Sequence, residues 1–148
     1  MKLNLQQLID AKACAQQVDL FQSLFGDSVD VTEASCVAVS DQFDWGFASR
    51  TLLTPSALAE FKLVTAPAWA EYYRRTAAAM AEYHRARAAV QAEYRSANPI
   101  PWAEYKRGTA AAMSEYRRVG ASAWAEFERG TAAAFGQLYS QAGNSRTS

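Results

Sequence analysis

A glutamate followed by an aromatic residue recurs every 11 positions from residue 60 to residue 127. Seven such pairs keep one register: Glu60-Phe61, Glu71-Tyr72, Glu82-Tyr83, Glu93-Tyr94, Glu104-Tyr105, Glu115-Tyr116 and Glu126-Phe127. Eleven residues complete three turns of a helix at about 3.67 residues per turn, so each unit presents the same faces along one axis. The pattern therefore predicts long α-helix over residues 58–142, of the hendecad coiled-coil kind.

A second column of large apolar residues lies on the same side of each unit, three residues before the aromatic column. A packing seam is the simplest interpretation of this stripe. Glutamates and the arginines three residues after them face elsewhere, spaced for ion pairs. The alternative interpretation is an interface, because aromatic side chains dominate binding energy at interfaces. Its candidate residues are Trp69, Tyr72, Tyr83, Trp102, Tyr105, Tyr116 and Trp124.

Proline divides the repeat region into two arms. Pro99 and Pro101 remove two backbone donors, and Pro99 disfavours helix at the residue before it. We therefore expect a break at 98–101, between a first arm over about 67–97 that begins at Pro67 and a second over about 101–141. An antiparallel helical hairpin would cover the aromatic seam and is the arrangement we expect. A kinked rod would expose the seam to a partner or a second copy.

Residues 1–57 do not repeat and predict a small N-terminal helical cap of short helices. Apolar spacing predicts helices over 3–9, over 13–25 and around Cys36, where Asp30 or Thr32 provides the cap.

The last part of this cap predicts a short helix over 43–53 and a new helix that starts at Thr54 and Pro55. Alternatively, residues 1–57 form a separate binding head, in which an acidic face and Trp45 can reach a partner. Residues 143–148 are expected to form a flexible tail. The fold class is thus all-α, with a cap followed by long repeat helices.

Charge is divided unevenly along the 148 residues, although 15 basic and 15 acidic residues give a net charge of zero. Residues 1–59 hold three basic and seven acidic residues, a net charge of −4, and residues 60–148 hold 12 basic and 8 acidic residues, a net charge of +4. The two parts can attract each other within one molecule or between molecules, and salt would weaken that attraction.

Cys14 and Cys36 lie among apolar residues, so we expect buried free thiols. The N-terminal residues lack the apolar core of a signal peptide, and no uncharged apolar stretch is long enough to span a bilayer. These observations predict a cytoplasmic protein without a membrane partner.

No catalytic, metal or cofactor site is expected. His84 is the only histidine and stands at a variable, solvent-facing position of the repeat. One histidine and two separated cysteines do not make an ordinary zinc site. Glycine-rich phosphate loops and the GxSxG and HExxH motifs are absent from the sequence. We therefore do not expect an enzyme.

The chain resembles a group of small phage and prophage-associated bacterial proteins with AEY-type 11-residue repeats. Units such as AEYYRRTAAAM from Ala70 carry this resemblance, together with Phe43-Asp44-Trp45 in the N-terminal part. It covers the chain from about Ala13 to Phe135 and implies a phage-like origin, which would place the protein in the cytoplasm of the bacterial host. It implies no particular activity.

The function predicted from the sequence is a helical interaction or scaffold protein that binds another protein or a second copy. One alternative is a phage inhibitor of a bacterial defence system, of the anti-CRISPR type, that acts by steric binding. Another is salt-sensitive nucleic-acid binding through the basic arms. Nucleic acid is the less expected partner, because a glutamate in every unit neutralises much of the positive field. A membrane-surface helix is also less expected, since alanine and paired charges make a poor lipid face.

Overall fold

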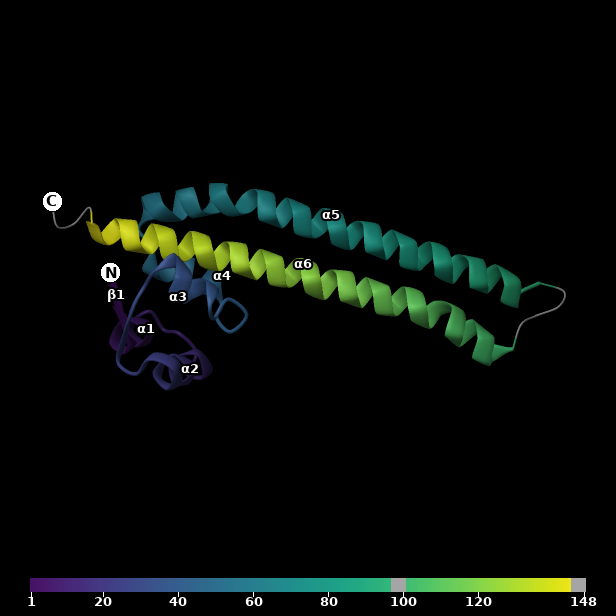
Figure 1. Cartoon of the computed structure of the whole chain (residues 1–148), viewed down its shortest axis with the longest axis horizontal. Coiled ribbons are helices and arrows are strands. Elements are labelled where there is room, and N and C mark those ends of the chain that lie inside the picture. Colours follow the sequence, from purple (N-terminus) through teal and green to yellow (C-terminus); the bar gives the residue numbers. More distant parts are fainter. Residues whose placement is uncertain (97–100, 145–148) are drawn as a thin grey trace. The chain divides into compact units, whose positions relative to one another are not determined.

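The computed structural model describes residues 1–96 and 101–144, with side chains described as far as residue 142 (Figure 1). In chain order the elements are β1 (Lys2–Asn4), α1 (Leu5–Asp10), α2 (Ala15–Phe25), β2 (Ser28–Asp30), α3 (Glu33–Val37), α4 (Trp45–Leu52), α5 (Pro55–Tyr94) and α6 (Trp102–Asn144). Helices α5 and α6 pack antiparallel as a hairpin, which confirms the predicted fold class.

Both predicted boundaries of the hairpin fall partly outside the described residues. Of the expected break at 98–101, residues 98–100 are not described, and α5 ends at Tyr94 before it. Of the expected tail at 143–148, residues 145–148 are not described, whereas residues 143 and 144 belong to α6.

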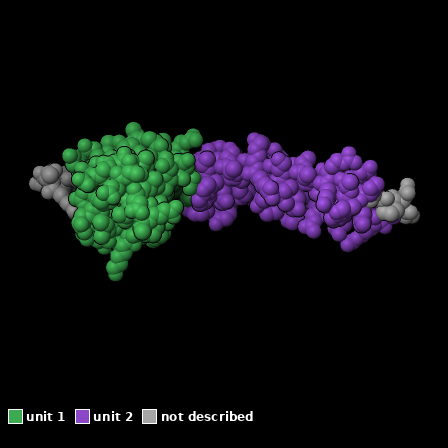
Figure 2. All heavy atoms as spheres, turned by 90° about the horizontal axis from the view of Figure 1, so that it is seen from below, with its two compact units in different colours: residues 1–68, 127–148 green, residues 69–126 purple. Residues whose placement is uncertain are grey.

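The chain divides into two compact units (Figure 2). Unit 1 contains residues 1–68 and 127–148, and unit 2 contains residues 69–126. Unit 1 therefore combines the N-terminal segment with the start of α5 and the end of α6. Unit 2 consists of the remaining parts of the two long helices.

Two short antiparallel strands belong to unit 1: β1 precedes α1 and α2, and β2 follows them. Leu3 of β1 pairs with Val29 of β2. The prediction of helix over residues 3–9 is thus wrong at Leu3, and α1 begins only at Leu5. Asn4 separates the two elements: its side chain accepts a hydrogen bond from the backbone of Gln7, and the Gln7 side chain accepts one from the Asn4 backbone.

The helix boundaries in the rest of the cap follow from capping residues. Thr32 is one of the two predicted caps, whereas the helix predicted over 43–53 begins only at Trp45. Gly26 ends α2 with a φ of 68°, which favours glycine. The side chains of Thr32 and Asp44 each accept a backbone hydrogen bond at the start of α3 and α4. Thr54 accepts from the backbone of Ala57 at the start of α5.

Pro67 lies inside α5, so the prediction that the first arm begins there is wrong. The proline has no N–H for the carbonyl of Leu63, four residues earlier. Leu63 is 76% exposed, so water can hydrate its backbone. Phe61 and Thr65 on the other side of the helix are buried, and their packing in unit 1 holds this turn in place.

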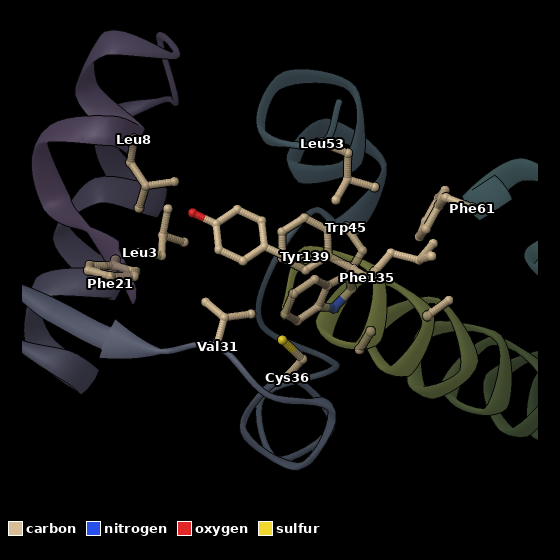
Figure 3. Close-up of a cluster of buried hydrophobic side chains, with 13 residues drawn as sticks. Leu3, Leu8, Phe21, Val31, Cys36, Trp45, Leu53, Phe61, Phe135 and Tyr139 are labelled. Carbon is tan, nitrogen blue, oxygen red and sulfur yellow. The ribbon is translucent and has the colours of Figure 1, made fainter. Parts of the chain in front are cut away.

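The core of unit 1 gathers around the last turns of α6 (Figure 3). Phe135 is only 1% exposed and lies 5.5 Å from the ring of Trp45. Gly136 allows this close packing, since a Cβ atom there would lie 2.6 Å from the carbonyl oxygen of Thr32. The buried side chains come from every part of the unit: Leu3, Leu8, Phe21, Val31, Cys36, Trp45, Leu53, Phe61, Ala132, Ala134, Phe135, Leu138 and Tyr139.

Candidate interaction edge of the hairpin

Each repeat unit of the hairpin places its side chains on two different edges. An α-helix turns about 100° per residue, so the glutamate before each seam aromatic lies about 100° to one side of it. The residue after the aromatic lies about 100° to the other side, and the residue three positions before it lies about 60° to that same side. We call these two sides the glutamate edge and the aromatic edge.

In unit 2, the aromatic edge of α5 contacts the aromatic edge of α6, and the two glutamate edges also contact each other. On the aromatic edge, the rings of Trp69 and Trp124 lie 6.4 Å apart, and the rings of Tyr72 and Trp124 lie 5.5 Å apart. On the glutamate edge, Arg75 donates to Glu126 at 2.5 Å. Unit 2 thus has two chemically different sides.

The seam between the edges is formed by half-buried tyrosines. Tyr83 and Tyr116 face each other across the helices, with ring centroids 6.4 Å apart. Threonines of the repeat bond back to the seam: the Thr76 hydroxyl donates to the carbonyl of Tyr72 at 2.8 Å. Gly108 allows the helices to approach, because a Cβ atom there would lie 2.8 Å from a methyl group of Val90.

Large aromatic side chains remain open to solvent on the aromatic edge. Between 38% and 62% of the surface of each is exposed, and the residues are Trp69, Tyr73, Trp102 and Trp124, together with the neighbouring seam residue Tyr94. At one end of unit 2, the rings of Trp69 and Tyr73 stack at 5.3 Å. A folded chain that keeps this much aromatic surface in water presents a candidate binding surface.

A second aromatic cluster lies at the other end of unit 2. Trp102 and Tyr105 stack with their ring centroids 4.8 Å apart and their planes 9° apart. Tyr94 of α5 contacts Trp102 at 6.2 Å. The Lys106 ammonium lies 5.6 Å from the centre of the Trp102 ring, within the range of a cation–π interaction.

The glutamate edge is neutralised by arginine, as the spacing predicts. Glutamates pair with arginines three residues later at 2.6, 2.8, 3.8 and 2.6 Å, in the pairs Glu71–Arg74, Glu82–Arg85, Glu104–Arg107 and Glu115–Arg118. Hydrogen bonds from Arg74 and Arg118 lower the pKa of Glu71 and Glu115. Glu126 departs from this pattern and accepts from Arg75 of the other helix.

The aromatic edge carries the remaining positive charge. Unit 2 holds nine lysines and arginines and six glutamates, a net charge of +3. Arg95, Lys106 and Arg117 directly follow seam tyrosines and are exposed on this edge. Arg87 stands where other units have threonine. The hydroxyls of the nearby seam residues, chiefly Tyr105 and then Tyr83, raise its pKa.

The residues predicted for the interface separate into three groups. Trp69, Trp102 and Trp124 are exposed on the aromatic edge. The tyrosines are half-buried in the seam and contribute only part of their rings to the surface: Tyr72, Tyr83, Tyr105 and Tyr116. The sequence interpretation missed the seam residue Tyr94. It also missed Tyr73 and Lys106, although their positions beside the seam follow from the same repeat.

Trp45 does not belong to this surface, and the prediction that a partner could reach it is wrong. It is 8% exposed and packs between Phe43 and Phe135 in unit 1. Its indole N–H donates to the backbone carbonyl of Ser40 at 2.8 Å. The indole therefore helps to complete the core.

The two cysteines also differ from each other. Both are free thiols, as predicted, but Cys14 is exposed, so the prediction that it is buried is wrong. Cys14 directly precedes α2, outside the packed face of that helix. Cys36 is buried, and burial raises its pKa to about 11. It lines an apolar cavity of about 60 Å³ in unit 1, together with Phe21 and Trp45.

Within residues 1–96 and 101–144, no group of three metal-ligating side chains is positioned to hold an ion. No helix in the described part of the chain is long and apolar enough to cross a membrane. Comparison with family models, curated proteins and solved structures gives no match. The relation to phage-associated repeat proteins therefore stays a prediction from the sequence.

Proposed function

We propose that this chain is a non-enzymatic binding protein that uses the aromatic edge of unit 2 to contact a partner macromolecule. The observation that carries the proposal is the row of exposed rings on that edge, which includes Tyr73 and Trp102. Exposed aromatic surface in water is unfavourable, and tryptophan and tyrosine are the residues that contribute most at interfaces. A partner would remove this surface from water.

The contacts within unit 1 support a structural role for that part of the chain. Phe61 of α5 and Phe135 of α6 belong to one buried cluster with residues of the N-terminal segment. That cluster fixes the start of α5 beside the end of α6. Amphipathic helices in proteins gain most of their stability from such tertiary contacts, since an isolated helix is marginally stable in water.

The state of the glutamates supports binding over catalysis. A general acid needs a raised pKa, whereas arginines lower the pKa of Glu71 and Glu115. His84 is exposed, and the centre of its ring lies 5.4 Å from the centre of the Tyr83 ring. It lies on the aromatic edge, away from these carboxylates. These groups are arranged as a charged surface and are not brought together around a reacting atom.

Site-specific photo-crosslinking in living cells tests the proposal. A photoreactive amino acid is placed at Tyr73 on the aromatic edge or, as the matched control, at Ala78, which is exposed on the other side of the same helix. We expect a discrete adduct from position 73 and none from position 78. Replacing Trp69 and Trp124 with serine should remove the adduct.

Two results would contradict the proposal. One is the absence of an adduct at position 73 under conditions in which the chain is folded. The other is an equal set of adducts from positions 73 and 78, which would show that the aromatic edge has no preference for a partner. Where position 73 gives the discrete adduct, digestion of that adduct with nuclease or with protease identifies the class of partner.

A further inference from the structure

We infer that the aromatic edge of unit 2 binds single-stranded nucleic acid. This inference rests on the proposed function, since it names the class of partner for the same surface. Three features of the edge carry it: exposed rings on which bases can stack, cations beside those rings, and the separation of the glutamates onto the opposite edge.

The rings on the edge are available for stacking. Trp102 is the most exposed tryptophan, with 55% of its surface open, and Tyr73 is 62% exposed at the other end of the unit. Their neighbours Tyr105 and Trp69 already stack on them in near-parallel planes, 9° and 19° apart. Proteins that hold single strands use such rings as platforms, because every base has a π face.

Cations accompany the rings along the edge. Lys106 lies over the Trp102 ring, and Arg87 is exposed beside the seam. Arg117 follows the seam residue Tyr116 on the same side as Trp124. Aromatic platforms next to positive side chains that follow a phosphate backbone are the features of single-strand grooves.

The position of the glutamates in the structure removes the reason for which nucleic acid is the less expected partner. From the sequence alone, a glutamate in every unit predicts a largely neutralised field. In the structure, the glutamates of unit 2 lie on the edge opposite Lys106 and Arg117, and four of them have an arginine three residues away. The net charge of +3 in unit 2 is therefore concentrated beside the exposed rings.

The same charge distribution argues against other occupants. Two copies that met through their aromatic edges would bring Lys106 and Arg117 of each chain close to like charges, which is unfavourable. Double-stranded nucleic acid keeps its bases stacked inside the helix, so it offers phosphates to the cations but no free base to the rings. A single strand satisfies both groups at once.

Fluorescence anisotropy of the purified full chain tests the inference. The probe is a labelled oligothymidylate of about 20 nucleotides, longer than common single-strand site sizes of about 4–16 nucleotides. The edge carries four cations: Arg87, Arg95, Lys106 and Arg117. They predict a slope of log affinity against log salt of about −2 to −3. Binding should therefore weaken roughly 16- to 64-fold between about 50 and 200 mM salt.

Two charge-matched variants locate the binding surface. Lys106→Gln combined with Arg117→Gln removes two positive charges from the aromatic edge. Arg74→Gln combined with Arg118→Gln removes two from the other side of the hairpin. We expect the first pair to weaken binding by roughly tenfold and to reduce the salt slope by about 1.4. The second pair should bind within about twofold of the unchanged chain.

Trp102→Ala tests stacking separately from charge. Affinity should fall by roughly tenfold while the salt slope stays unchanged, because no phosphate contact is lost. Circular dichroism of the variant should match that of the unchanged chain, since Trp102 is exposed.

Four results would overturn the inference. The first is an absence of binding at about 50 mM salt, where a basic surface binds most strongly. The second is an equal loss of affinity in both charge-matched variants. The other two come from competing probes: a DNA duplex that binds equally or more tightly than the single strand, or polyglutamate with the same number of charges that binds equally. The last result would assign the edge to an acidic protein. In that case the adduct at position 73 would resist nuclease, and the proposed function would stand without this inference.

Discussion

The two units use the same 11-residue repeat in opposite ways. In unit 1, the residues of the aromatic column are Phe61 and Phe127, and both are buried. In unit 2 the same column contains tyrosines that are half-buried or exposed. Phenylalanine therefore stands where the chain excludes water, and tyrosine stands where a hydroxyl can reach water or a partner such as Arg87.

The column three residues before the aromatic shows the same contrast. Phe135 of unit 1 is 1% exposed, whereas Trp102 at the equivalent repeat position of unit 2 is 55% exposed. The N-terminal segment packs over the column in unit 1. Within unit 2, the two helices cover the seam but leave this column at the edge. The repeat thus determines which side of the helix a residue lies on. Whether that side is core or surface depends on whether a further segment, such as the N-terminal residues in unit 1, packs over it.

Replacing tryptophan in each unit should give the largest contrast. Trp45→Ala removes a buried ring and leaves a cavity, so the free energy of unfolding should fall by about 3–5 kcal/mol. Trp102→Ala should change it by less than about 1 kcal/mol, because the ring is exposed. Urea denaturation followed by circular dichroism measures both.

If Trp45→Ala does not fold, Trp45→Phe provides the comparison, because it keeps an aromatic ring of smaller size and removes the hydrogen bond to Ser40. A loss of about 1–2 kcal/mol is then expected. Equal effects at positions 45 and 102 would contradict the difference between the two units.

The cysteines test whether the core of unit 1 is closed. Cys14 is exposed and should react with a thiol reagent in the native protein. Burial raises the pKa of Cys36 to about 11 and blocks the reagent, so its reaction at pH 8 should be slower by about 100-fold or more. Mass spectrometry of the labelled peptides measures the two rates. Both thiols should react at similar rates in denaturant, and rapid native labelling of Cys36 would show that the core opens.

Glycines of α6 test the packing of each unit. Gly136→Ala places a Cβ atom against the backbone of Thr32 and Glu33, so we expect a loss of about 2 kcal/mol. Gly120 has open space around it, and Gly120→Ala should increase stability by about 0.5–1 kcal/mol through helix propensity. Thermal and urea unfolding measure both changes. A stabilising Gly136→Ala would mean that α6 does not approach α3 this closely.

The ion pair across the helices should have the smallest effect. Arg75 and Glu126 are both partly exposed, so a double-mutant cycle with Arg75→Gln and Glu126→Gln should give about 0.2–1 kcal/mol, less at high salt. A coupling of zero at low salt would mean that the two helices do not hold this register in solution.

Much of the fold followed from local signals in the sequence. The repeat predicted the helices and their shared seam, and Thr54 followed by Pro55 marked the start of α5. The arginine pairs on the glutamate edge followed from their spacing. Such features depend on residues within one or two turns of each other, which periodicity and capping rules describe.

The missed features depend on residues far apart in the chain. Strand β1 is only three residues long and exists because it pairs with β2, so no periodic pattern predicts it. The burial of Trp45 depends on Phe135, 90 positions later. The two edges could have been assigned from the 100° turn per residue, but their exposure depended on how α5 and α6 pair.

Absolute molar mass by light scattering, at low and high salt, tests most directly whether the aromatic edge is open for a partner. The account predicts a single chain of 16.2 kDa at every protein concentration. A stable dimer that dissociates when Trp69 and Trp124 are replaced with serine would contradict it. The exposed rings would then be covered by a second copy and would not be free to bind another macromolecule.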